Sequence, residues 1–115
     1  MDVRNLLNII GDLVLRVYAF GSLVRPVFVG KVLSITLQAK RGIAEFRILS
    51  GGSLLGLSVA VLLINQPLGY HLLGVAWIGA GTTRVLSYFV DRPPLNATYI
   101  VSFIGEITLG IMMLV

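Results

Sequence analysis

The sequence predicts an all-α membrane protein: a four-helix transmembrane bundle with up-down topology, forming a single domain over residues 1–115. Of the 115 residues, 57% are hydrophobic and only 12% are charged, whereas soluble domains carry about 25% charged residues. Several apolar runs reach the roughly 20 residues that a helix needs to cross the hydrocarbon layer. Prolines and basic residues separate these runs, as expected of turns at a membrane surface.

The first predicted helix covers residues 6–24 and contains two charged side chains. Asp12 and Arg16 are four positions apart, so they lie on one face of a helix. Such a face is tolerated when it turns towards other helices and is costly when it faces lipid. A surface amphipathic helix that never crosses is the alternative. Arg25-Pro26 marks the end of this helix.

The segment Val27–Gln38 is apolar but too short to cross a membrane as a helix. Its valine, isoleucine and threonine content is typical of a strand-like or interfacial segment. We expect it to lie at the membrane surface, between the first and second helices.

Three further helices are predicted, over residues 43–64, 68–90 and 95–115. Asn65-Gln66-Pro67 separates the first two, and Asp91-Arg92-Pro93-Pro94 separates the last two. Proline ends a preceding helix and is well suited to the first turn of the next one. Because both connections are tight, the helices that they join should be antiparallel neighbours.

Glycine is abundant, with 13 residues, many of them inside the predicted helices. In a membrane, small residues allow helix backbones to approach closely. Gly52-x-x-x-Gly56 is one such small-residue pair. We interpret it as ordinary packing within the bundle rather than as a dedicated dimerisation motif.

The basic residues predict the orientation of the bundle. With four crossings, both termini and the turn at residues 65–67 share one side, where Arg4 is offset by Asp2. The opposite side carries most of the cations: Arg25, Lys31, Lys40, Arg41 and Arg92. Positively charged loops face the cytoplasm. Both termini are therefore predicted to lie outside it.

The composition argues against several classes of function. The formal net charge is +4, but the cations flank apolar runs, so an anionic membrane surface explains them better than nucleic acid does. The absence of cysteine removes thiolate metal sites and a cysteine nucleophile. His71 is a possible axial ligand of a haem or a chlorophyll, but a histidine at that depth is typical of a membrane interface. No phosphate-binding loop, metal-spaced cluster or serine-nucleophile motif is present. We predict no enzyme activity and no catalytic or metal site, and the sequence specifies no cofactor.

Placing an ionisable residue inside a membrane helix costs free energy, so each such residue calls for a structural or functional explanation. Glu106 lies near the middle of the fourth predicted helix, and Arg84 and Arg16 are candidate partners for it. We predict an intramembrane polar cluster that faces the bundle interior, with at least one arginine bridging to a carboxylate: Arg47, Arg84, Asp91, Glu106, Asp12 and Arg16. A carboxylate held by arginines suits a structural ion pair better than a proton carrier.

Three stretches resemble a known family when they are taken together. They are Ala44-Glu45-Phe46-Arg47 followed by Gly51-Gly52, then Gly81-Thr82-Thr83-Arg84 leading through Val85-Leu86-Ser87 to Asp91-Arg92-Pro93, and finally Glu106. This pattern is similar to small bacterial four-helix membrane proteins, the domain of unknown function four-three-four-five family. The resemblance covers roughly residue 44 to the end.

The resemblance implies that seven residues matter: Arg47, Gly51, Gly52, Arg84, Ser87, Asp91 and Glu106. It also implies a multi-pass protein of the bacterial inner membrane, and it supplies no activity. Two positions depart from the pattern, because Thr83 stands where glycine is usual and Arg92 stands where glycine commonly follows the aspartate.

The favoured hypothesis is an accessory or scaffold subunit of a larger membrane complex, whose partners are the lipid bilayer and other membrane protein subunits. Small size and loops too short to form an extramembrane domain support it. One alternative is a small oligomeric proton-coupled transporter that uses Glu106. Another is a subunit that binds a lipid, a quinone or a pigment between its helices.

Overall fold

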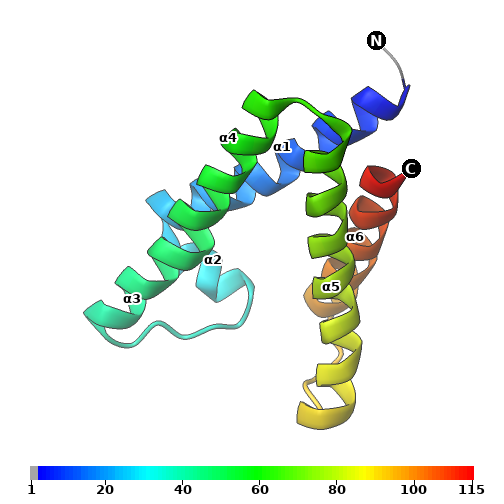
Figure 1. The fold of residues 1–115 in the computed structure, drawn as a ribbon. Helices are drawn as coiled ribbons and strands as arrows, with labels where there is room; N and C mark the ends of the chain where they lie inside the picture. Colours follow the sequence, from blue (N-terminus) through cyan, green and yellow to red (C-terminus); the bar gives the residue numbers. More distant parts are fainter. Residues whose placement is uncertain (1–2) are drawn as a thin grey trace. The chain divides into compact units, whose positions relative to one another are not determined.

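The structure is a computed structural model that describes residues 3–115 and is predominantly helical (Figure 1). Its elements are α1 (Val3–Val24), α2 (Pro26–Val32), α3 (Lys40–Phe46), the π-helical segment η1 (Arg47–Ser53), α4 (Leu54–Ile64), α5 (Pro67–Asp91) and α6 (Ala97–Leu114). The chain divides into two compact units. One combines the residues up to Gly11 with Gln66–Val115, and the other is Asp12–Asn65.

Three helical stretches of the described chain are long and apolar enough to cross a membrane: Val3–Val24, Lys40–Ile64 and Ala97–Leu114. They fit a multi-pass membrane protein. The first of them contains Asp12 and Arg16, the two charged residues that left a surface helix as the alternative to a membrane crossing. The third predicted span, found as α5, has 25 residues but is not among the three. Its glycines, paired threonines and Arg84 make it less apolar than the others.

The segment between the first two long helices is not a strand. Pro26 begins the short helix α2, in keeping with the preference of proline for the first helical turn. After Val32, Ser34 adopts a left-handed conformation with φ 61°. The Ser34 and Ile35 amides donate to the carbonyls of Lys31 and Gly30 at 3.1 and 2.7 Å. These two bonds form a Schellman cap, so local capping overrides the β-branched composition.

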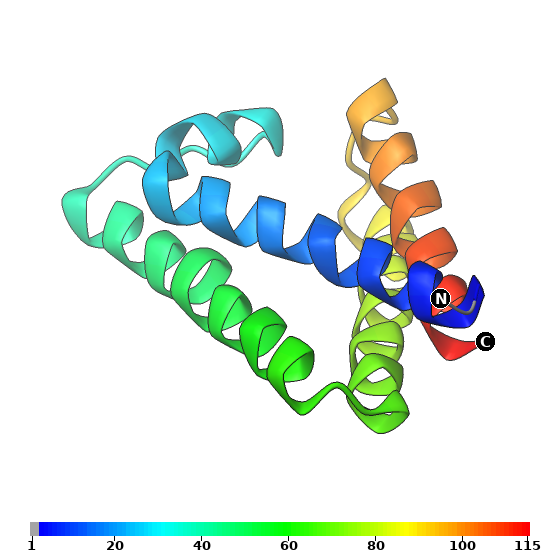
Figure 2. The ribbon, with the colours of Figure 1, turned by 90° about the horizontal axis from the view of Figure 1, so that it is seen from above.

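In the unit Asp12–Asn65, α1 runs antiparallel to the long helix made by α3, η1 and α4 (Figure 2). Leu23 lies against Gly51 near one end of this contact, and Asp12 lies against Ser58 farther along. A Cβ atom at Gly51 would lie 2.9 Å from the Cα and N atoms of Leu23. Glycine is therefore required there, because the obstacle is backbone that cannot rotate away.

The π-helical segment η1 was not predicted from the sequence. It covers Arg47–Ser53 and includes the Gly51-Gly52 pair. A Cβ atom added at either member of the predicted small-residue pair, Gly52 or Gly56, would meet nothing within 4 Å. Within the unit Asp12–Asn65 this pair therefore makes no close packing contact, whereas its neighbour Gly51 does. The interpretation of the pair as packing within the bundle stays a prediction.

In the other unit, α5 and α6 form an antiparallel hairpin, and they lie side by side in both views (Figures 1 and 2). A Cβ atom at Gly110 would lie 3.0 Å from the Gly74 carbonyl oxygen and 2.6 Å from the Ile78 side chain. Gly81 similarly accommodates Ile107. Close packing at glycine is the arrangement that small residues allow in membrane helices. It fixes the register that brings Arg84 opposite Glu106.

Candidate functional site: two charge pairs within the helices

Arg84 of α5 and Glu106 of α6 form a two-pronged ion pair across the hairpin. Arg84 Nε donates to Glu106 Oε1 at 2.6 Å, and Arg84 Nη2 donates to Oε2 at 3.0 Å. The two side chains are 25% and 13% exposed. Two parallel charge-assisted hydrogen bonds match the flat guanidinium to the flat carboxylate and fix their relative orientation. The pair therefore joins the two helices as well as neutralising both charges.

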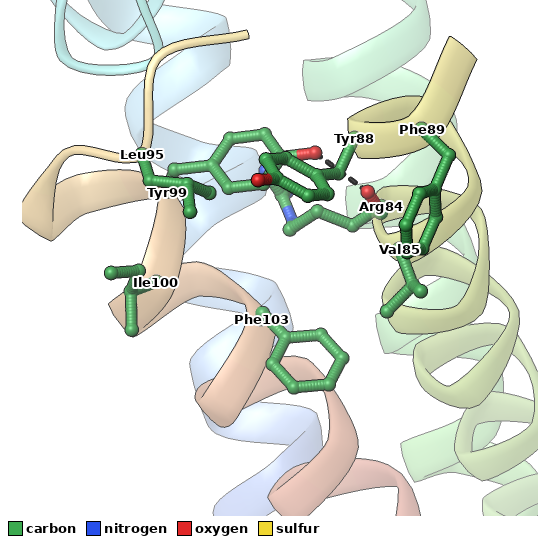
Figure 3. Close-up of a pocket in the computed structure, with 8 residues that line it drawn as sticks. All are labelled: Arg84, Val85, Tyr88, Phe89, Leu95, Tyr99, Ile100 and Phe103. Carbon is green, nitrogen blue, oxygen red and sulfur yellow. Dashed lines mark hydrogen bonds between the residues drawn. The ribbon is translucent and has the colours of Figure 1, made fainter. Parts of the chain in front are cut away.

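Tyr99 places a second restraint on Arg84 (Figure 3). The guanidinium carbon lies 5.1 Å from the centre of the Tyr99 ring, within cation–π range. The Tyr99 hydroxyl donates to the Arg84 carbonyl oxygen at 2.6 Å. Asn96 caps α6 by accepting a hydrogen bond from the Tyr99 amide at 2.9 Å. The beginning of α6 is thereby tied to the turn of α5 that carries the arginine.

Two hollows adjoin this pair. The one in Figure 3 measures about 220 Å³ and is lined by Arg84, Val85, Tyr88, Phe89, Leu95, Tyr99, Ile100 and Phe103. Its volume is below the roughly 300–1,000 Å³ of typical ligand pockets. The other measures about 420 Å³ and is lined by Gly79, Ala80, Thr83, Arg84, Ser87, Tyr99 and Glu106. Glu106 is therefore reachable from one side of the hairpin, although its oxygens are held by Arg84.

Asp12 and Arg16 form the second charge pair, in the unit Asp12–Asn65, and Ser58 is hydrogen-bonded to both. Arg16 Nη2 lies 2.6 Å from Asp12 Oδ2. The Ser58 hydroxyl donates to Asp12 Oδ1 at 2.7 Å and accepts from Arg16 Nε at 3.3 Å. Asp12 and Ser58 are fully buried. Asp12 and Arg16 lie one turn apart on α1, as their spacing predicts, and Ser58 of α4 adds its hydroxyl to the pair.

The sequence did not predict that Ser58 belongs to this site. Ser58 interrupts the apolar run Leu54–Ile64, and a lone serine in such a run is usually a tolerated small residue, since its hydroxyl can bond its own helix. The signal that could have identified it is its position in an apolar helix that must pack beside a charged one. Only the antiparallel register of α1 and α4 shows that it meets Asp12.

The remaining two members of the predicted cluster lie elsewhere. Asp91 is exposed at the end of α5 and has no ion pair among the described residues. It lies seven residues beyond Arg84, about 10 Å farther along the helix, beside the connecting loop and beyond the first turn of α6. Arg47 is exposed at the start of η1, in the other unit. Neither joins a charge pair among the described residues, and the prediction that they face a bundle interior stays a prediction.

Two buried polar atoms have no hydrogen-bond partner within residues 3–115: Asn8 Oδ1 and Trp77 Nε1. Both belong to the unit that contains the hairpin. Among the described residues, no three His, Asp or Glu side chains gather closely enough to hold a metal ion.

Comparison with models of known protein families, with curated proteins and with solved structures found no match. The resemblance to the domain of unknown function four-three-four-five family therefore stays a prediction, carried by the three stretches of sequence that suggest it.

Proposed function

We propose that this protein is a non-enzymatic accessory or scaffold subunit of a larger membrane complex. The observation that carries the proposal is that two of the three carboxylates within the candidate membrane spans, Asp12 and Glu106, are largely shielded from solvent and held by arginines. Asp12 is bound by Arg16 and Ser58, and Glu106 is bound by Arg84. A carboxylate used to carry protons or ions must release its partner in every cycle, whereas a structural pair stays formed. Both pairs therefore favour a structural role.

Exposed apolar side chains supply the surface for assembly. Leu63 on α4 and Val90 on α5 are each 79% exposed. Such surfaces on membrane helices are covered by lipid or by neighbouring helices. Because the short loops leave no room for an extramembrane domain, contacts with a partner would be made by the helices themselves.

The proposal includes a membrane crossing by α5. Bound to Glu106, Arg84 is part of a neutral pair rather than an isolated charge, which lowers the cost of placing it at membrane depth. Four crossings then give an up-down four-helix bundle in the bacterial inner membrane. The basic loops would face the cytoplasm and both termini would lie outside it.

Cysteine accessibility tests this topology, because the chain has no native cysteine. Gln66→Cys and Arg92→Cys flank α5, so they lie on opposite sides only if α5 crosses. A membrane-impermeant maleimide added to intact spheroplasts should label the cysteine at position 66 and leave that at position 92 unlabelled. Equal labelling of the two cysteines would show that α5 does not cross the membrane.

Photo-crosslinking in cells tests the accessory role. A photo-reactive amino acid replaces Leu63 or Val90 in the tagged full chain, and the same amino acid at Leu73, which is 1% exposed, is the control. The exposed positions should each capture one recurrent membrane protein that also co-purifies in mild detergent, and Leu73 should not. A chain that purifies alone and crosslinks only to lipid at both positions would contradict the proposal.

A small proton-coupled transporter is the second candidate, favoured by the hollow of about 420 Å³ that reaches Glu106. It requires Glu106 to leave Arg84 during transport. Proton-coupled uptake or efflux by reconstituted vesicles, abolished by Glu106→Gln, would establish it over the accessory role. A quinone or pigment subunit has less support, because the hollow of about 220 Å³ shown in Figure 3, here called the aromatic hollow, is below the usual size of a ligand pocket.

A further inference from the structure

A basic hollow lies in the unit Asp12–Asn65, where the end of α1, the helix α2 and the beginning of the next long helix come together. It measures about 570 Å³ and is lined by Val24, Arg25, Pro26, Val27, Phe28, Lys31, Ile43 and Arg47. Three of these residues are cationic and none is acidic. The helices α2 and α3 are in contact, and cations from two parts of the chain, Arg25 with Lys31 and Arg47 at the start of η1, line the same hollow.

The three cations of this basic hollow are not neutralised by the protein. Among the described residues, Arg25, Lys31 and Arg47 form no ion pair, and all three are exposed. In contrast, Arg16 and Arg84 are each paired with a carboxylate. The unit's other carboxylate, besides the buried Asp12, is Glu45, which lies 3.9 Å from Arg41. The hollow is therefore lined by three positive charges that no carboxylate of the described residues neutralises.

Apolar side chains border the same cations. Val24, Val27 and Phe28 line the hollow and are 57%, 51% and 60% exposed. A ligand that satisfies the whole surface must combine an anionic group with an apolar portion. Free inorganic phosphate would use only the cations, and an acidic soluble peptide would leave the aromatic and aliphatic surface facing water.

We propose that the basic hollow binds the phosphate headgroup of an anionic phospholipid, with the acyl chains against Val27 and Phe28. The hollow lies between the candidate spans Val3–Val24 and Lys40–Ile64, at the connection where a membrane surface is expected. Basic pockets between membrane helices on the cytoplasmic side are suited to anionic lipid headgroups. The proposal is independent of the accessory role, because any membrane protein could hold such a lipid.

Lipid retention by the purified full chain tests this. The protein is extracted from vesicles of equal parts phosphatidylglycerol and phosphatidylcholine, and its bound lipids are counted by native mass spectrometry. The wild type should retain phosphatidylglycerol selectively. Each of Arg25→Gln, Lys31→Gln and Arg47→Gln should weaken retention about five-fold, and the triple variant about a hundred-fold.

A matched variant removes the same charge from outside the hollow: Lys40→Gln, Arg41→Gln and Arg92→Gln. It should retain phosphatidylglycerol as the wild type does, and equal losses in the two triple variants would overturn the proposal. Displacement of the lipid by about 10 mM inorganic phosphate in the assay would also overturn it, since that result identifies a site for a free anion. If the triple variant fails to fold, the exposed Lys31→Gln variant decides between the same outcomes.

Discussion

The two charge pairs have the same shortest distance but hold different parts of the molecule. Arg16–Asp12 and Arg84–Glu106 both measure 2.6 Å. The first lies within one helix, one turn apart, and reaches α4 only through the Ser58 hydroxyl. The second is itself the link between two helices. A third pair, Arg41–Glu45, repeats the one-turn spacing at 3.9 Å, with its side chains 91% and 55% exposed.

The difference shows that burial and connectivity determine what a pair contributes. Asp12 is fully buried, so its arginine neutralises a charge that water cannot reach. Glu106 is 13% exposed, so its arginine mainly fixes the position of α6 on α5. Solvent-exposed pairs contribute little because water and salt screen them. Substitutions should therefore destabilise the protein most at the Arg16–Asp12 pair, whose carboxylate is fully buried, less at the interhelical Arg84–Glu106 pair, and least at the exposed Arg41–Glu45 pair.

Arg16→Ala should be the most damaging of these substitutions. It leaves Asp12 buried with only Ser58, and an unpaired buried charge costs about 3–5 kcal/mol in soluble proteins. Measured as folded yield in detergent and as the denaturant midpoint, the loss should be severe. Arg41→Ala, at the same one-turn spacing, should leave both quantities unchanged. Similar losses for Arg16→Ala and Arg41→Ala would show that burial does not distinguish the two pairs.

Arg84→Ala should have the next largest effect, about 2 kcal/mol, because a charge-assisted interhelical pair is lost. Glu106 retains some access to water, which limits the penalty relative to Asp12. Folded yield and thermal midpoint in detergent measure the change. Arg92→Ala, on the exposed turn after α5, is the control and should do little. Equal tolerance of the two substitutions would refute a structural role for Arg84.

Gly110→Ala should lower the thermal midpoint by the equivalent of about 1–2 kcal/mol, because the added methyl group meets Ile78 and the Gly74 carbonyl. Gly105→Ala, on the same helix, meets nothing within 4 Å. It should be neutral or slightly stabilising, since alanine is the better helix former. If Gly105→Ala were the more harmful of the two, the packing of α5 against α6 would be wrong.

Tyr99→Phe should have the smallest effect, about 1 kcal/mol, because one hydrogen bond to the Arg84 carbonyl is lost while the ring stays beneath the guanidinium. The thermal midpoint in detergent measures it. Tyr88→Phe, whose ring also lines the aromatic hollow, is the matched control. A loss as large as that of Arg84→Ala would mean that the hydroxyl, rather than the ion pair, holds the hairpin.

Much of the helix pattern could be predicted from the sequence, because apolar length and proline position are local signals. The helices predicted at 68–90 and 95–115 are found as Pro67–Asp91 and Ala97–Leu114. For residues 27–38 the strand-like alternative is wrong, since composition favoured extended chain while capping at Ser34 favoured the short helix α2. The placement of this segment at the membrane surface stays a prediction. The π-helical turn of η1 has no composition signal that separates it from an α-helix.

The candidate site was predicted only where spacing along one helix was sufficient. Asp12 and Arg16 follow from helical geometry, and depth in the membrane suggested Arg84 with Glu106. Ser58 depends on the register between two helices, which the sequence does not encode locally. Asp91 was expected in the cluster because antiparallel neighbours bring helix ends on one membrane side together, but it is exposed at the end of α5.

The most direct test of the structural role of the pairs is a double substitution at Arg84 and Glu106. Arg84→Leu and Glu106→Leu each leave one charge without its partner, whereas the double variant leaves none. Replacing both members of a buried pair with apolar residues is often neutral. The thermal midpoint of the double variant in detergent should therefore exceed that of either single variant and approach that of the wild type. A midpoint lower than both singles, with their losses adding, would contradict a structural role for the pair.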